Sequence, residues 1–338
     1  MFLWAWLACG GGAAPVDTPP DLVGVVLYAG DHTVLVEPDG APGVRRLEAG
    51  TERPTPGATH AFWLEGDHVQ RSAERGAGTV PEGWSAEGLP VRGTVMERSE
   101  SRVVLDHSAI PTVMDAMVMG FTVAPHEAAP LMPGDTVEAR IVRSRYGWQL
   151  VEPVKTGTAD VWTDAGVPAL LVGDTLESVT LEGPDGPVTV GAGQGEPTLL
   201  TFVYTRCPDP SFCPAIAARL AALESQLVGG RILTVTLDPD HDTLPVLARW
   251  SKSVGAGERW VTARLTGDAL RALALRSGQH VTVQGARISH LHRVLVLDAE
   301  GVLIERYDDD AWPADRVVRQ LATGQPRARE GTVGTESP

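Results

Sequence analysis

Residues 198–227 constrain the fold of this chain more than any other segment. They open with the apolar run TLLTFVY, which is typical of a buried strand. Pro214 suits the first turn of a following helix, because its missing N–H costs nothing there. Apolar residues then recur at helical spacing, at Ile216, Leu220, Leu223 and Leu227. A buried strand followed directly by a helix with an apolar face predicts an α/β domain.

The chain after residue 153 continues this alternation. Its further predicted elements are the strand RILTVTL, a helix near 244–250, a helix over 268–277, the hairpin HRVLVLDAEGVLIERY and a last helix over 314–322. This order predicts a thioredoxin-like α/β domain over residues 160–324. The polar tail, 325–338, is expected to be disordered.

The first half of the chain instead carries short β segments separated by turn signals such as PDG. We therefore expect two small all-β, barrel-like modules, over residues 21–75 and 88–153. The two modules open alike, with VGVVLYAGDHTVLVEP in the first and VRGTVMERSESRVVLD in the second. This similarity suggests a duplicated barrel.

The net charge of the chain and its N-terminal residues indicate where the protein is located and what it can bind. Lys and Arg number 28 against 43 Asp and Glu, a net charge of −15, which disfavours binding to nucleic acid and to anionic membranes. The start, MFLWAWLACGGG, resembles a bacterial lipoprotein signal over residues 1–20 in which Cys9 would be lipidated. That resemblance implies a lipid anchor as the only membrane contact, and a place on the periplasmic side of the cell envelope. The two other cysteines would then lie in an oxidising compartment.

Those two cysteines, Cys207 and Cys213, have five residues between them and lie between the predicted strand and the start of the helix. A helix N-terminus favours an anion, so we expect the pKa of the Cys213 thiol to be lowered. Thiolates bind Cu(I), zinc or iron–sulfur centres, and two cysteines alone cannot close a zinc site. Cu(I) accepts two or three soft ligands, and His290 is the candidate for the third. His292 would share its face if a strand has already begun there.

Three sequence stretches resemble the Sco (SenC) copper-chaperone family: LLTFVYTRCPDPSFCPAIAARL, LTVTLDPDHDTLPVLARW and ISHLHRVLVLDAEGVL. The resemblance implies a thioredoxin-like fold and copper ligands at Cys207, Cys213 and His290, with Asp238 on an adjacent acidic loop. It also implies a copper-accepting partner, the CuA centre of cytochrome c oxidase or another copper enzyme. The family motif has three residues between its cysteines, whereas this chain has five. The segment DPDHDT does not continue as a calcium-binding EF-hand loop, because Thr243 stands where that loop requires glycine.

A second soft-ligand pattern lies in LDHSAIPTVMDAMVMGFTV. It resembles a periplasmic copper-binding domain of the CusF type, a small five-stranded β-barrel. The resemblance implies Cu(I) ligands at His107, Met117 and Met119, with Met114 as a further candidate. Thioethers and imidazole suit Cu(I) and survive oxidising conditions. The structural alternative is that these methionines fill a core.

The sequence thus predicts a copper metallochaperone in which the β module captures Cu(I) and the C-terminal domain holds and delivers it. Two alternatives remain open for the protein as a whole. It could be a thiol–disulfide oxidoreductase, with Cys207 and Cys213 as its catalytic redox pair, that prepares an acceptor's cysteines for metal. It could also sequester copper for resistance. For the cysteines themselves, a structural disulfide is a further reading.

Overall fold

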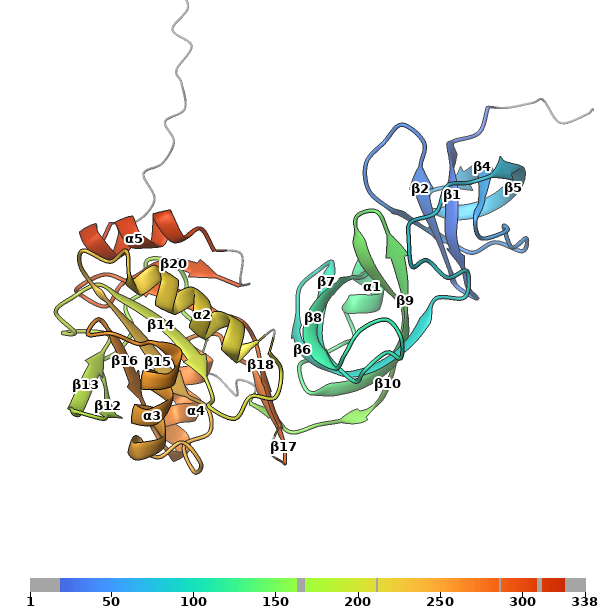
Figure 1. Cartoon of the computed structure of the whole chain (residues 1–338). Coiled ribbons are helices and arrows are strands. Elements are labelled where there is room, and N and C mark those ends of the chain that lie inside the picture. Colours follow the sequence, from blue (N-terminus) through green and yellow to red (C-terminus); the bar gives the residue numbers. More distant parts are fainter. Residues whose placement is uncertain (1–18, 163–167, 211, 286, 309–311, 326–338) are drawn as a thin grey trace, which may run out of the picture.

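The computed structural model describes residues 19–162, 168–210, 212–285, 287–308 and 312–325. Lipidation at Cys9, nearly all of the predicted signal and nearly all of the predicted tail lie outside these residues. The described chain forms two β-barrels followed by an α/β domain (Figure 1). None of the helices described is both long enough and apolar enough to cross a membrane.

The first barrel is closed, with strand order β1-β2-β3-β5-β4 and a return from β4 to β1. Its strands are β1 (Leu22–Ala29), β2 (Thr33–Pro38), β3 (Arg45–Glu48), β4 (Ala58–Glu65) and β5 (His68–Ala77). Inward-facing apolar residues fill it, and Val26, Val36 and Phe62 are fully buried. The turns between these short strands explain why the sequence showed the segments clearly.

The second barrel repeats this arrangement. Its elements are β6 (Leu89–Arg98), β7 (Arg102–His107), β8 (Met117–Thr122), the short helix α1 (Pro125–Ala128), β9 (Asp135–Ser144) and β10 (Gly147–Thr158). Their order, β6-β7-β8-β10-β9 with β9 closing on β6, matches the first barrel strand for strand. In both barrels the third and fifth strands pair in parallel, as in OB-fold barrels. The similar sequences at the two module starts therefore correspond to the same two opening strands.

The C-terminal domain is built on a five-stranded sheet of order β16-β15-β14-β19-β20. Its strands and helices are β14 (Thr198–Val203), α2 (Cys213–Glu224), β15 (Arg231–Thr236), α3 (Leu244–Val254), β16 (Trp260–Ala263), α4 (Gly267–Arg276), β19 (Val294–Leu297), β20 (Leu303–Tyr307) and α5 (Ala314–Thr323). Strands β14, β15 and β16 run parallel, β19 runs antiparallel to β14, and β20 runs antiparallel to β19 and so in the direction of the first three. Every residue of the central strand β14 is buried, which accounts for its unbroken apolar sequence. This is the predicted thioredoxin-like arrangement.

Two features of this domain were not predicted. A hairpin of β12 (Val179–Gly183) and β13 (Gly186–Val190) precedes the sheet. A separate three-stranded sheet joins β11 (Val161–Trp162), β17 (Val281–Gln284) and β18 (Arg287–His290). His290 is thus the last residue of its own strand, and β19 begins only at Val294. The condition under which His292 was expected to share the face of His290 is therefore not met, because His292 lies beyond the end of β18.

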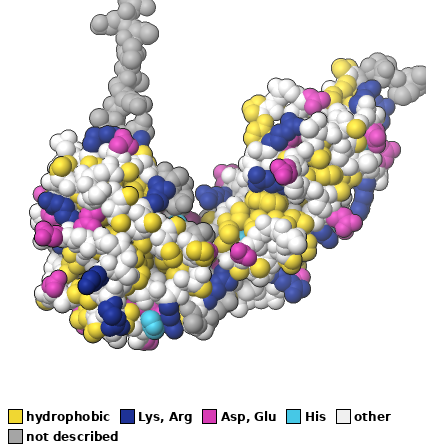
Figure 2. Space-filling view, viewed as in Figure 1, with side chains coloured by type: hydrophobic (Ala, Val, Ile, Leu, Met, Phe, Trp, Pro, Cys, Tyr) yellow, Lys and Arg dark blue, Asp and Glu magenta, His cyan; other side chains and the backbone are white. Residues whose placement is uncertain are grey.

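The second barrel packs against this small sheet, with β7 and β8 on the side nearest β17 and β18 (Figure 1). Met96 and Val104 of the barrel share a buried apolar cluster with Val161 and Leu291. Hydrophobic side chains gather where the barrel and the C-terminal domain meet (Figure 2). The contact brings the Met-rich strand β8 close to the cysteine-bearing loop.

Candidate metal centre

The two cysteines lie at the junction of β14 and α2. The strand leads into Cys207, which is half-buried, and Cys213 is the first residue of the helix and is buried. Both are free thiols, so the structure does not contain the structural disulfide. Despite the five residues between them, the Cys213 thiol hydrogen-bonds to Cys207. The longer loop therefore still allows the two sulfur atoms to converge.

The activated thiol is Cys207, and the prediction that it would be Cys213 was wrong. A hydrogen bond from the Cys213 thiol is the largest effect that lowers the pKa of Cys207, to about 6, and the Cys213 backbone N–H and the Tyr204 hydroxyl add to it. Cys213 donates this bond and is buried, so its own pKa is raised well above the usual value. The helix N-terminus does stabilise a thiolate, but that thiolate belongs to the residue facing it rather than to the first helical residue.

His290 supplies the nitrogen predicted as the third ligand. Its Nδ1 hydrogen-bonds to the Leu291 carbonyl oxygen at 2.9 Å, and its Nε2 lies 3.8 Å from Sγ of Cys213. Burial is the main cause that lowers the pKa of His290 to about 3, so the ring is neutral at physiological pH. Because Nδ1–H donates a hydrogen bond to this carbonyl, Nε2 carries the lone pair and faces Sγ of Cys213. A neutral imidazole oriented in this way is how proteins present histidine to a metal ion.

An aromatic ring closes one side of this group. Phe212, directly before the helix, packs edge-on against His290 with 4.7 Å between ring centroids. It also contacts His292, with 3.6 Å between centroids. Cys213 Sγ and His290 Nε2 therefore lie together next to an apolar wall, and soft donors of this kind suit Cu(I) better than a hard cation.

The acidic loop after β15 braces the cysteine loop. Asp242 is fully buried and accepts hydrogen bonds from the Thr205 N–H at 3.0 Å and from the hydroxyls of Thr205 and Thr236, each at 2.5 Å. Asp238 forms an ion pair with Arg206 at 2.5 Å. Thr205 and Arg206 directly precede Cys207, so both carboxylates hold the backbone that leads into the site.

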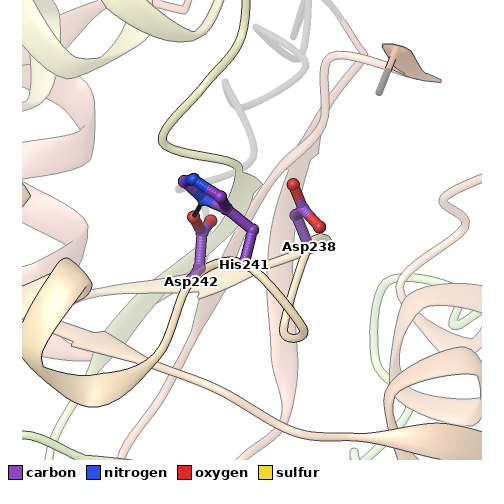
Figure 3. Close-up of side chains that lie close together, drawn as sticks. All are labelled: Asp238, His241 and Asp242. Atoms are coloured by element: carbon purple, nitrogen blue, oxygen red, sulfur yellow. Dashed lines mark hydrogen bonds and ion pairs between the residues drawn. The ribbon is translucent and has the colours of Figure 1, made fainter. Parts of the chain in front are cut away.

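Asp238, His241 and Asp242 lie close together, with potential ligand atoms within 4.8 Å of one another (Figure 3). His241 hydrogen-bonds to Asp242 at 2.9 Å. The two carboxylates are already engaged by Arg206 and by the threonines, so the cluster serves as a brace. The sequence placed Asp238 on a loop next to the site but gave no role to Asp242 or Thr205.

The register of the second barrel brings together His107, Met117 and Met119. His107 ends β7 and pairs directly with Met117, which begins β8, so the two side chains share a face. Met119 pairs with Leu105 on that same face and packs, like Met114, against the barrel core. The structure is thus compatible both with a metal site and with methionines that fill the core.

The imidazole of His107 is set up in the same way as that of His290. It is fully buried, and its Nδ1 hydrogen-bonds to the Ser108 carbonyl oxygen at 2.8 Å. Its Nε2 is buried without a hydrogen-bond partner among the described residues. Burial lowers the pKa of His107, so the ring is neutral and Nε2 carries a lone pair. A buried polar atom without a partner is costly, and a ligand that binds it would remove that cost.

The C-terminal domain thus belongs to the class of thioredoxin-like domains with a Cys–Cys pair at a helix N-terminus and a histidine on a neighbouring strand. Residues 180–324 match the family model SCO1/SenC. This part of the chain is therefore a SCO1/SenC domain, as its motifs predicted. The match begins at residue 180, so it does not extend to the two barrels.

Solved structures of Sco proteins are similar to a little under half of the chain. Yeast Sco1 with copper bound is 19% identical, with 46% of this chain and 90% of that chain covered and a TM-score of 0.35. Arabidopsis thaliana ScoI with copper bound is 18% identical, with coverages of 45% and 96% and a TM-score of 0.37. A SCO1/SenC family lipoprotein from Bacillus anthracis is 18% identical, with coverages of 44% and 94% and a TM-score of 0.39. A search of curated proteins found none that matches the chain.

Proposed function

We propose that this protein is a copper metallochaperone whose C-terminal domain binds copper through Cys207, Cys213 and His290. The observation that carries the proposal is the position of the His290 Nε2, 3.8 Å from Cys213 Sγ, with Nδ1 held by the Leu291 carbonyl oxygen. Membership of this domain in the SCO1/SenC family supports copper as the metal. The acceptor would be a copper protein, such as the CuA subunit of cytochrome c oxidase.

The thiols favour copper capture at neutral pH. Because the pKa of Cys207 is about 6, this residue is mainly a thiolate there and can bind Cu(I) without first losing a proton. Cys213 would lose its proton when copper binds. His290 adds a neutral nitrogen ligand and needs no proton transfer.

We extend the proposal to the second barrel, where His107, Met117 and Met119 would hold a second Cu(I) ion, with Met114 as a further candidate. The direct pairing of His107 with Met117 supports this site, as does the unpartnered Nε2 of His107. We also propose that lipidated Cys9 anchors the protein to the membrane on the periplasmic side of the envelope.

An anaerobic titration with Cu(I) tests the proposal. The wild-type chain with both thiols reduced should bind two equivalents of Cu(I). A Cys207→Ser/Cys213→Ser chain should bind one equivalent and lack thiolate-to-Cu(I) absorption. If the reduced wild-type chain bound no stoichiometric copper, the proposal would be wrong.

A thiol–disulfide oxidoreductase is the second candidate, favoured by the unequal thiols. Cys207 is the more exposed and has the lower pKa, so it would attack a partner disulfide. Buried Cys213 would then displace the partner as the resolving thiol. The two activities can coexist in one protein, because reduction of acceptor cysteines prepares them for copper.

A further inference from the structure

The second barrel is fastened to the C-terminal domain by charged groups at a largely buried contact. Asp106, next to His107 on β7, is buried and accepts hydrogen bonds from Arg287 at 2.7 Å and from the Thr282 hydroxyl at 3.0 Å. Glu97 on β6 forms an ion pair with buried Arg293 at 2.7 Å. Buried ion pairs need well-fixed geometry to offset the cost of removing charge from water. These pairs therefore define one docked position.

In that position, the start of β8 faces the cysteine loop across a cavity of about 400 Å³. Ala116, Met117 and Val118 line it on the barrel side, and Cys207 and Phe212 line it on the other side. A second cavity of about 570 Å³ is lined by Met117, Met119, Phe212 and His292. Met117 therefore lies on the walls of both cavities, between the His/Met group of the barrel and the thiols.

Successive side chains along β7 and β8 point to opposite faces. One face of this hairpin can therefore dock on the C-terminal domain while the other carries the proposed copper ligands. Asp106 and Val118 point outward and make the docking contact. His107 and Met117, their immediate neighbours in sequence, point to the opposite face. His107, which ends β7, and Met117, which begins β8, lie at the end of this hairpin. The loop over residues 109–116 that connects the two strands borders the cavity that Cys207 also lines.

We propose that the second barrel is the internal copper donor of the C-terminal domain, so that Cu(I) passes within one chain from His107, Met117 and Met119 to Cys207. This inference rests on the proposed function, because it requires both copper sites. In the transfer, bonds from copper to the barrel's imidazole and thioethers break as bonds to the two thiolates and to His290 form. Copper remains Cu(I), and one proton leaves Cys213 for solvent, so no oxidant or reductant is needed.

Chemistry and proximity favour this direction. Thioethers are neutral ligands, whereas thiolates are anionic ligands, so copper should bind more tightly at the thiol site. Tethering gives the two sites an effective concentration of about 1 mM, far above the micromolar concentrations of separate proteins. Transfer within the chain should therefore outpace transfer between chains.

The test follows anaerobic loading of the thiol site from a Cu(I)–bicinchoninate complex by stopped-flow absorption of the Cu(I)–thiolate bond. Met117→Leu should slow the appearance of this absorption by about tenfold, because copper must then reach the thiols directly from solution. Met132→Leu is the matched control, since Met132 is 55% exposed and lies outside both cavities described above. It should load like the wild type.

A second variant tests docking without changing any proposed ligand. Glu97→Gln/Arg287→Gln removes both ion pairs across the contact and should slow loading of the thiols by a similar factor, while the chain still binds two Cu(I). Arg45→Gln, which breaks the 2.7 Å pair with Asp67 in the first barrel, is its control and should have no effect.

The outcomes separate the two proposals. Thiolate absorption that appears at the wild-type rate in both Met117→Leu and the docking variant would overturn the internal transfer but leave both copper sites intact. If no chain showed thiolate absorption, the proposed function itself would fail. Slow loading in both test variants, with normal loading in both controls, supports the transfer.

Discussion

Nε2 of His290 lies 3.8 Å from Sγ of Cys213, although the two residues are 77 positions apart in the sequence. The histidine ends a strand of the small sheet, and the cysteine begins the helix that follows the central strand. Their meeting places a neutral nitrogen next to the Cys213 thiol, which is itself hydrogen-bonded to Cys207. The predictions below depend on this arrangement and on its counterpart in the second barrel.

His290→Ala should abolish stoichiometric copper binding at the thiol site and leave disulfide exchange largely intact. The imidazole would provide one of the three proposed ligands, but neither the hydrogen bond between the thiols nor the helix N-terminus depends on it. Copper content and the rate of exchange with a small disulfide measure the two effects. His68→Ala, at an exposed histidine of the first barrel, should change neither. Equal loss of both activities would show that His290 holds the loop rather than the metal.

Alkylation of the reduced protein should occur at Cys207 and follow a titration with a midpoint of about pH 6. The lowered pKa means that the reactive thiolate prevails above this pH and is lost as the pH falls through it. Cys213 should remain unmodified in the folded protein, because it is buried and its pKa is raised. Iodoacetamide labelling with mass spectrometry over pH 4.5–8 measures both sites. A faster reaction at Cys213 would reverse the assignment.

Tyr204→Phe should shift the midpoint for Cys207 upward. The hydroxyl of Tyr204 donates a hydrogen bond that stabilises the Cys207 thiolate, and the same burial and negative charge raise the pKa of the tyrosine. Loss of one hydrogen bond to a charged group costs roughly 1.5–3 kcal/mol. The Cys213 thiol and backbone N–H still donate to the Cys207 thiolate in this variant, so the shift of the Cys207 pKa should be smaller than this energy implies. The labelling titration measures the shift. An unchanged midpoint would mean that the tyrosine does not contact the thiolate.

Asp242→Ala should destabilise the C-terminal domain by roughly 2–4 kcal/mol, because it leaves the Thr205 N–H and two buried or partly buried hydroxyls without their acceptor. It should also increase the exposure of the cysteine loop. Asp240→Ala, two positions away and exposed, should change stability by no more than about 0.5 kcal/mol. Denaturant unfolding measures both variants. Equal free energies of unfolding for the two variants would show that Asp242 does not brace the cysteine loop.

His107→Leu separates a metal ligand from a core residue in the second barrel. Leucine fills the space of the imidazole with an apolar side chain and removes a buried nitrogen that has no hydrogen-bond partner among the described residues. The free energy of unfolding of the apo protein should therefore stay within about 1 kcal/mol of the wild-type value. Copper at the barrel should nevertheless be lost, leaving one Cu(I) per chain at the thiols. If two Cu(I) were still bound, His107 would be only a core residue.

The sequence predicted the parts of this protein that depend on local patterns. Examples are the unbroken apolar run of β14, the helical spacing of α2 and the hairpin β19–β20. In each of them, the pattern of apolar residues within the element itself shows which residues are buried. His290 was found because the stretch ISHLHRVLVLDAEGVL resembles a family motif. The short strands β17 and β18 were missed, since few residues carry their signal.

The reversed assignment of the two thiols shows a limit of reasoning from local sequence. The helix start at Cys213 was predicted correctly, but which sulfur receives the helix N–H depends on side-chain direction and burial across the loop. The docking of the second barrel depends on Asp106, Glu97 and their arginine partners from another domain. No pattern within one segment reveals such a pair. The brace at Asp242 is of the same kind, because it joins two loops.

X-ray absorption of a single Cu(I) bound to the His107→Leu/Met117→Leu chain tests the central claim most directly. With His107 and Met117 replaced, only Met119 and Met114 of the proposed barrel ligands remain, so the single copper ion should bind at the proposed thiol site. We predict two sulfur ligands and one nitrogen ligand, and loss of the nitrogen when His290→Ala is added. A copper ion without sulfur ligands, or no bound copper while both thiols are reduced, would contradict the account.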